Sequence, residues 1–170
     1  MALHIVFSHG KESGPWGCKI KAMATLAKPF GEIHSIDYQS LVSPDDRANK
    51  LINYINTLNG NIILVGSSMG GYVSTLAANN EKVVGLFLLA PAFYLPGYNV
   101  EKPTTTCNNI AIVHGWQDDI VSFTHSVEFA HNHQSTLKLV ADGHRLSNSY
   151  DVLAAELAVV IHKGMKNITT

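Results

Sequence analysis

Residues 66–70 of the sequence, GSSMG, place a serine between two glycines at the spacing G-x-S-x-G. This spacing is typical of a sharp turn from a strand into a helix that exposes the central serine as a nucleophile. An apolar run at 61–65 precedes the motif, and a segment of helical character at 72–78 follows it. We therefore predict that Ser68 is a nucleophile and that Ser67 is not. The alternative is a tight glycine turn that only packs a helix on a sheet.

A serine nucleophile needs a base from elsewhere in the chain. His144 is the best placed of the nine histidines, because it follows the last predicted strand and precedes the last predicted helix. His9 and His114 also follow strands, but each precedes a glycine, and we expect them to support the shape of their loops. His131 and His133 lack a third candidate ligand, so we predict no metal site there. The remaining histidines are expected to be ordinary strand, surface or helix residues: His4, His34, His125 and His162.

A carboxylate should orient the base. In one hydrolase arrangement the chain order is Ser, then Asp or Glu, then His. Asp118 follows the apolar run 110–113 and lies between Ser68 and His144 in the sequence. It would hold the imidazole in the correct tautomer and stabilise its protonated form. The neighbouring Asp119 is the alternative carboxylate, or a solvated turn residue or helix cap.

Negative charge on an attacked carbonyl is stabilised by backbone N–H groups. We expect one from Met69, directly after the nucleophile. The second is expected from Lys11, in the glycine-rich loop after the first strand, where Gly10 allows close approach of the backbone. Such a loop could also bind phosphate, but neither the dinucleotide-binding spacing nor the P-loop spacing of glycines occurs in it.

Short apolar runs alternate with amphipathic segments and position these residues. Strands are predicted at 3–8, 33–38, 62–65, 83–89, 110–113 and 137–140, and helices at 17–30, 44–58, 69–79, 122–133 and 149–162. Buried strands separated by helices predict a parallel sheet between two helical layers, an α/β/α sandwich, with ligands at the carboxyl ends of the strands. The long segment 91–108, which contains three prolines, is predicted to be a surface loop near the site.

The composition limits the classes of function. The 170 residues are 46% hydrophobic and carry a formal net charge of −1, which predicts one globular domain over residues 1–170. The charges are scattered, so we expect neither a nucleic-acid partner nor insertion into a membrane. The beginning of the sequence lacks the pattern of a signal peptide. We therefore expect a cytoplasmic protein in which Cys18 and Cys107 are reduced thiols, and we predict no cofactor.

These segments together resemble the α/β-hydrolase superfamily. The resemblance rests on HG at 9–10, the GSSMG motif, HGWQD at 114–118 and GH at 143–144. Residues 8–17, SHGKESGPWG, and 142–146, DGHRL, are similar to small, lidless bacterial serine hydrolases of the esterase-like and dienelactone-hydrolase-like group. The resemblance implies a six-stranded sheet of order 2-1-3-4-5-6, without the N-terminal hairpin or a cap. Dienelactone hydrolases proper use a cysteine nucleophile, which argues against their substrate here.

The resemblance implies hydrolysis at a carboxyl centre, with Ser68, Asp118 and His144 as the catalytic residues. We expect an ester or thioester of a small acyl substrate to be cleaved through an acyl-enzyme. Amidase, peptidase or cofactor-free peroxidase activity is an alternative within enzymes, and a non-catalytic receptor or interaction module is an alternative outside them. Four aromatic residues in loops at the carboxyl ends of strands are expected to line the substrate pocket: Trp16, Phe93, Tyr94 and Trp116.

Overall fold

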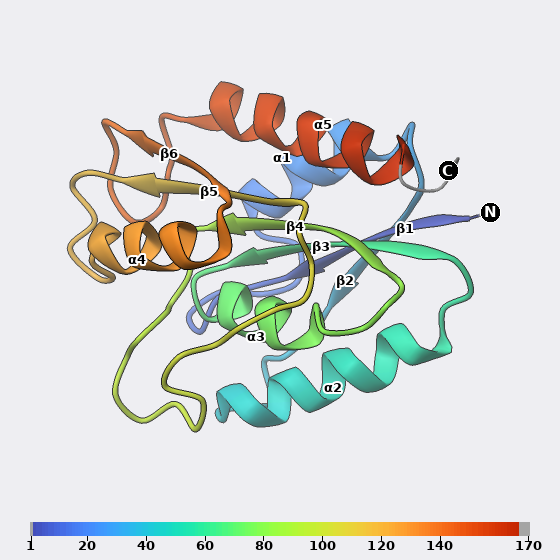
Figure 1. Ribbon diagram of the computed structural model, residues 1–170, viewed down its shortest axis with the longest axis horizontal. Helices are drawn as coiled ribbons and strands as arrows, with labels where there is room; N and C mark the ends of the chain where they lie inside the picture. Colours follow the sequence, from blue (N-terminus) through green and yellow to red (C-terminus); the bar gives the residue numbers. More distant parts are fainter. Residues whose placement is uncertain (1, 167–170) are drawn as a thin grey trace.

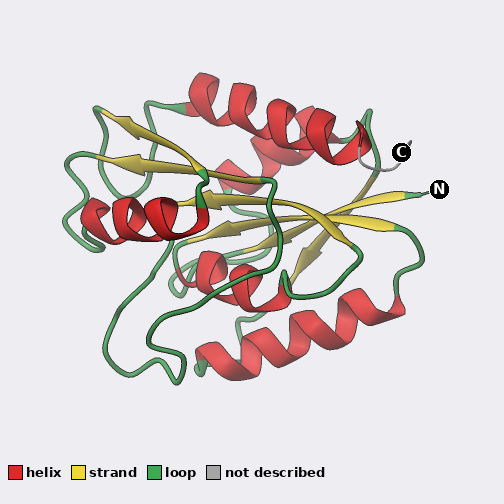
Figure 2. Cartoon of the chain, in the orientation of Figure 1, coloured by secondary structure: helices red, strands yellow, loops and turns green. Residues whose placement is uncertain are grey.

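The computed structural model describes residues 2–166, along which strands and helices alternate (Figures 1 and 2). The strands are β1 (Leu3–Ser8), β2 (Glu32–Ile36), β3 (Asn61–Ser67), β4 (Val83–Leu89), β5 (Ile110–Gly115) and β6 (Thr136–Val140). The helices are α1 (Cys18–Ala27), α2 (Pro44–Thr57), α3 (Met69–Ala77), α4 (Phe123–His133) and α5 (Tyr150–Lys166). The domain that we predict over residues 1–170 includes residue 1 and residues 167–170, which lie outside the described residues.

The six strands of this described part form one parallel sheet with the order β2-β1-β3-β4-β5-β6. The predicted sheet and its strand order are confirmed. Because every strand runs in the same direction, the loops that follow β1, β3, β5 and β6 meet at one edge of the sheet. This edge is the one at which Ser68, Asp118 and His144 lie.

Helices cover both faces of the sheet and confirm the predicted three layers. Figure 1 shows α1 and α5 on one face and α2, α3 and α4 on the other. The side chains of β1 alternate accordingly: Ile5 and Phe7 belong to the core under α1 and α5, whereas Val6 belongs to the core under α2 and α3. All three are fully buried. Strands packed on both faces therefore hold the edge that carries Ser68, Asp118 and His144 on a rigid base.

The position of α2 follows from its local sequence. The side chain of Ser43 accepts a hydrogen bond from the N–H of Asp46 (3.3 Å), and Pro44 fits the first helical position. Leu51 and Ile55, one turn apart on the same side, have no exposed surface. Burial of such a side chain contributes about 1.5–3 kcal/mol. The cap therefore fixes where α2 begins, and Leu51 and Ile55 hold the helix against the core on this face of the sheet.

The long connection from β4 to β5, residues 90–109, contains neither helix nor strand, as predicted. It runs alongside α3 (Figure 1) and is anchored to the end of that helix. Asn79 donates to the carbonyl of Thr104 (3.0 Å) and accepts from the N–H of Thr106 (3.1 Å). Thr105 donates to the carbonyl of Ala78 (3.0 Å).

Among residues 2–166, no helix combines the length and apolar character needed to span a lipid bilayer.

Candidate active site

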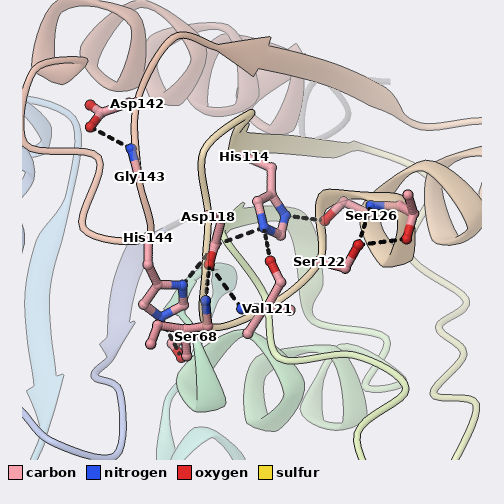
Figure 3. Close-up of polar contacts among 11 residues, drawn as sticks. Ser68, His114, Asp118, Val121, Ser122, Ser126, Asp142, Gly143 and His144 are labelled. Carbon is pink, nitrogen blue, oxygen red and sulfur yellow. Dashed lines mark hydrogen bonds and ion pairs between the residues drawn. The ribbon is translucent and has the colours of Figure 1, made fainter.

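Ser68, His144 and Asp118 come from three different loops and lie in hydrogen-bonding contact (Figure 3). The Oγ of Ser68 lies 3.1 Å from Nε2 of His144, and Nδ1 of His144 lies 2.7 Å from Oδ2 of Asp118. Because a carboxylate only accepts, the proton of His144 is on Nδ1. Nε2 is then free to accept the hydroxyl hydrogen of Ser68, which is the arrangement of a base beside a nucleophile.

The backbone at Ser68 makes the sharp turn that the motif predicts. Its φ is 53° and its ψ is −119°, between the end of β3 and the start of α3. A non-glycine residue in such a conformation costs about 1–3 kcal/mol. The flanking glycines leave no room for a side chain: a Cβ on Gly66 would overlap the carbonyl oxygen of Gly70, and one on Gly70 would overlap that of Ser8. Close packing of the backbone thus exposes the hydroxyl of Ser68 at the edge of the sheet.

The carboxylate of Asp118 is enclosed and receives four hydrogen bonds. Oδ1 accepts the N–H groups of Ile120 (2.9 Å) and Val121 (2.8 Å). Oδ2 accepts Nδ1–H of His144 (2.7 Å) and Nε2–H of His114 (2.9 Å). Burial alone would raise the pKa of Asp118, but these hydrogen bonds outweigh burial and hold the pKa well below its ordinary value. Asp118 is therefore ionised and fixed in orientation at neutral pH.

The contact of His114 with this carboxylate is not predicted by the sequence, from which a role in loop shape is expected. His114 is fully buried at the end of β5, and its Nε2 faces both Asp118 and the carbonyl of Val121 (3.0 Å). Nε2 must therefore carry the proton, and Nδ1 accepts from the hydroxyl of Ser126 (2.7 Å). Ser126 belongs to α4, so this chain of hydrogen bonds ties α4 to the site (Figure 3). In the sequence, the feature that could have indicated this contact is a histidine four residues before Asp118, at the end of an apolar strand.

Asp142 holds the loop that carries His144. Its Oδ1 accepts the N–H of Gly143 (2.8 Å), and its Oδ2 accepts the N–H of Asn148 and the hydroxyl of Ser149 (both 2.8 Å). Burial acts to raise the pKa of Asp142, but these three hydrogen bonds together outweigh it and lower the pKa, so the carboxylate stays ionised. The loop is closed on both sides of His144, which restricts where the imidazole can lie.

The loop after β1 lies directly against Ser68. A Cβ on Gly10 would be 3.4 Å from the Cβ of Ser68. The carbonyl of Gly10 accepts Nδ1–H of His9 (2.7 Å) and an N–H of Arg47 (3.2 Å). Burial lowers the pKa of His9, which keeps its ring neutral. Since the N–H of a trans peptide points opposite to its C=O, the N–H of Lys11 points away from His9 and Arg47.

Arg47 is a second residue of this region that the sequence interpretation does not include. Only 3% of its surface is exposed. Besides Gly10 it donates to the carbonyl of Leu41 (2.8 Å), and its guanidinium lies 5.6 Å from the ring centroid of Tyr38. A cation in the first turn of a helix opposes the helix dipole. That unfavourable placement in α2 is the signal by which Arg47 could have been found.

The sequence pattern of the alpha/beta hydrolase family matches residues 5–159. The chain belongs to this family. No curated protein has a sequence that matches this hydrolase.

Solved structures share the fold of this alpha/beta hydrolase over nearly its whole length. A protein of the alpha/beta superfamily from Xanthomonas campestris pv. campestris is 27% identical, with a TM-score of 0.84, and the match covers 94% of this chain and 98% of that one. Est1E from Butyrivibrio proteoclasticus is 18% identical, with a TM-score of 0.74 in a structure with ferulic acid bound, and the match covers 98% of this chain and 90% of that one. The ydeN gene product of B. subtilis is 18% identical, with a TM-score of 0.72 over 93% and 100% of the chains.

The four aromatic residues expected around the substrate differ in exposure. Trp16 and Trp116 are about half exposed, at 47% and 50%. Tyr94 is half-buried in the loop after β4. The prediction for Phe93 is wrong: its side chain has no exposed surface and stacks on Phe129 of α4, with the ring centroids 4.3 Å apart. An apolar ring in a loop can turn inward to the core, and here it does.

Proposed function

We propose that this hydrolase cleaves a carboxylic ester or thioester of a small substrate through an acyl-enzyme formed on Ser68. The observation that carries the proposal is the continuous hydrogen-bonded chain from the Oγ of Ser68 through His144 to the ionised Asp118. This chain can take a proton from the hydroxyl and stabilise the imidazolium that results.

The reaction proceeds in two halves. In the first half, Oγ of Ser68 attacks the carbonyl carbon and its proton moves to Nε2 of His144. The tetrahedral intermediate then collapses, and His144 gives that proton to the departing alkoxide or thiolate. In the second half, water attacks the acyl-enzyme while His144 takes the proton from the water. The intermediate releases the carboxylic acid, and the proton returns to Ser68. Asp118 holds Nδ1–H throughout and remains ionised.

Two backbone N–H groups are proposed to stabilise the oxyanion. That of Met69 is at the start of α3, where the first N–H groups of a helix have no partner within the helix. That of Lys11 points away from His9 and Arg47, which hold the preceding carbonyl. Its loop packs on Ser68. Removal of one such donor typically costs about a hundredfold to a thousandfold in kcat.

A small acyl group is proposed because the β4–β5 connection, residues 90–109, contributes no helix that could cover a long chain. The half-exposed rings of Trp16 and Trp116 offer apolar surface, and each methylene added to a ligand on a shallow surface gains little burial. The binding of ferulic acid, a small carboxylic acid, by Est1E agrees with this size class. Cytoplasmic location also remains a proposal, in agreement with the free thiols of Cys18 and Cys107.

A fluorophosphonate probe tests the nucleophile. We expect the wild-type chain to be labelled on Ser68, Ser68→Ala to lose both labelling and hydrolysis of p-nitrophenyl acetate, and Ser67→Ala to retain most of both. Ser67 is the matched control because it is the adjacent hydroxyl at the end of β3. If folded wild-type protein is not labelled, the site is that of a non-catalytic receptor. If Ser67→Ala is the inactive variant, the assignment of the nucleophile is wrong.

A further inference from the structure

A cluster of two histidines and one glutamate lies toward the amino ends of two strands, whereas Ser68 lies at the carboxyl ends. His4 is near the start of β1, and Glu32 and His34 are in the edge strand β2 (Figure 1). The parallel register places His4 opposite Glu32 and Val6 opposite His34. Since alternate residues of a strand share a face, all three side chains lie on the same face of the sheet.

The three side chains converge on one point. Nδ1 of His4 lies 3.0 Å from Nε2 of His34. The carboxylate oxygens of Glu32 lie 3.5 Å from the former atom and 3.9 Å from the latter. Among residues 2–166 this is the one group of three histidine, cysteine or acidic side chains whose ligand atoms all lie within 4.8 Å of one another. Bonds of about 2.0–2.2 Å to a tetrahedral Zn²⁺ would place neighbouring ligand atoms about 3.4 Å apart.

The outward nitrogens of both rings are held by other groups. Nε2–H of His4 donates to the carbonyl of Asn59 (3.1 Å). Nδ1 of His34 accepts from the hydroxyl of Tyr54 on α2 (2.8 Å). Partners of this kind orient the ligand rings in metal sites. The side chains of His4 and His34 are only 8% and 10% exposed, so their inward nitrogens are fixed before any ion arrives.

The hydrogen bonds indicate the tautomers of the two rings. In the metal-free state Nε2–H of His34 donates to Nδ1 of His4, because the other nitrogen of His4 carries its proton toward Asn59. If the proton of His34 moves from Nε2 to Nδ1, it donates to the oxygen of Tyr54. Both inward lone pairs then become available without net loss of a proton.

We propose that His4, Glu32 and His34 bind Zn²⁺, with water in the fourth position. Two imidazoles and one carboxylate are a donor set that zinc uses in proteins. The ion would join β1 to the edge strand β2. Since four residues of strand span about 13 Å, the site is remote from the loop at His9 and Gly10, and its effect is on stability rather than on hydrolysis.

Isothermal titration of the untagged, chelator-treated full chain with ZnCl₂ at about pH 7.5 tests the site. We expect one zinc per wild-type chain and at least tenfold weaker binding by Glu32→Gln. We expect no binding at this site by His34→Gln. His131→Gln removes an exposed histidine of α4 and serves as the matched control, with unchanged binding. Zinc should raise the melting temperature of the wild type and of His131→Gln by about 5 °C, and that of His34→Gln by less than about 1 °C.

Three results would overturn the proposal. Wild-type protein without zinc binding would show that the cluster is a hydrogen-bond network alone. Equal affinity of wild type, Glu32→Gln and His34→Gln would place the ion elsewhere. Inhibition of hydrolysis by one equivalent of zinc, together with loss of binding in His144→Gln, would place it at the active site. If His34→Gln does not fold, Glu32→Gln decides, because the side chain of this glutamate is 68% exposed and its replacement leaves the core intact.

Discussion

Replacement of Asp118 by asparagine should remove nearly all activity, and the four hydrogen bonds to this side chain explain why. Oδ1 accepts from two backbone N–H groups, those of Ile120 and Val121, and Oδ2 accepts from two imidazole N–H groups. An amide has one oxygen and one NH₂ group. In either orientation, the NH₂ group of the introduced asparagine would face two donors. Rotation of the amide by 180° therefore cannot satisfy both the backbone N–H groups and the imidazole N–H groups.

In one response, the amide oxygen stays with the backbone N–H groups and His144 changes tautomer. His144 then carries its proton on Nε2 and cannot accept the proton of Ser68. Loss of the correct tautomer costs about ten-thousandfold in kcat, which corresponds to about 5.5 kcal/mol of transition-state stabilisation. If the two imidazoles instead keep their tautomers, their N–H groups lose an acceptor. The free energy of unfolding then falls by about 3–6 kcal/mol, at about 1.5–3 kcal/mol for each charge-assisted hydrogen bond.

Steady-state hydrolysis of p-nitrophenyl acetate measures the loss, and urea unfolding shows whether the variant is folded under the conditions of the assay. Asp119→Asn is the matched control: Asp119 is exposed next to the same turn, and its replacement should change kcat less than about threefold, as for a solvated surface residue. Activity of Asp118→Asn within tenfold of the wild type would refute the tautomer argument. If Asp119→Asn is inactive and Asp118→Asn is active, the carboxylate that orients His144 is Asp119 and not Asp118.

Three further changes test the residues around the site. His114→Leu removes a hydrogen-bond donor from Asp118, so we expect the free energy of unfolding to fall by about 2 kcal/mol and kcat/KM to fall about tenfold. His114→Gln should restore part of both. Unchanged kinetics in folded His114→Leu would exclude a positioning role. Arg47→Lys cannot donate at once to the carbonyls of Gly10 and Leu41 as the guanidinium does. Because this loosens the loop that carries the N–H of Lys11, and an oxyanion donor acts in the transition state, we expect kcat to fall about tenfold with little change in KM; a change in KM alone would contradict this. Burial lowers the pKa of Lys19 to about 8. The folded state therefore releases this proton before the unfolded state, and wild-type stability should rise between about pH 8 and pH 10. Lys19→Met should lack that rise and be about 1–2 kcal/mol more stable at pH 7; equal urea midpoints for the two chains at both ends of that range would refute it.

The fold was predictable because each element carries a local signal. The buried strands are apolar runs and α2 begins with a capping serine and a proline, so the order of elements and the parallel sheet follow from the sequence alone. The ends of elements were less predictable where a tertiary contact decides them. We predict a strand that reaches Tyr38, whereas β2 ends at Ile36, because the N–H of Tyr38 donates to Nε2 of His9 (2.9 Å) rather than to a neighbouring strand.

At the candidate site, the sequence indicates the residues that belong to a recognisable motif. It does not indicate residues whose role depends on a contact with a residue distant in the sequence. Ser68 and the H-G and G-H pairs are visible in the sequence. The contacts of His114 with Ser126, and of Arg47 with Gly10, depend on how α4 and α2 pack against the sheet. For the same reason, His4 and His34 are ordinary strand residues in the sequence, and only the register of β1 and β2 brings them together with Glu32.

The strained backbone at Ser68 has a consequence for attempts to make this protein more robust. Its φ of 53° is imposed by the packing of Gly66 and Gly70, whatever residue is placed between them. Glycine adopts such a conformation without the penalty of about 1–3 kcal/mol that serine bears. A directed-evolution library selected for heat resistance alone should therefore accumulate glycine at position 68 and yield sturdy, inactive protein. Any such selection needs a simultaneous requirement for turnover.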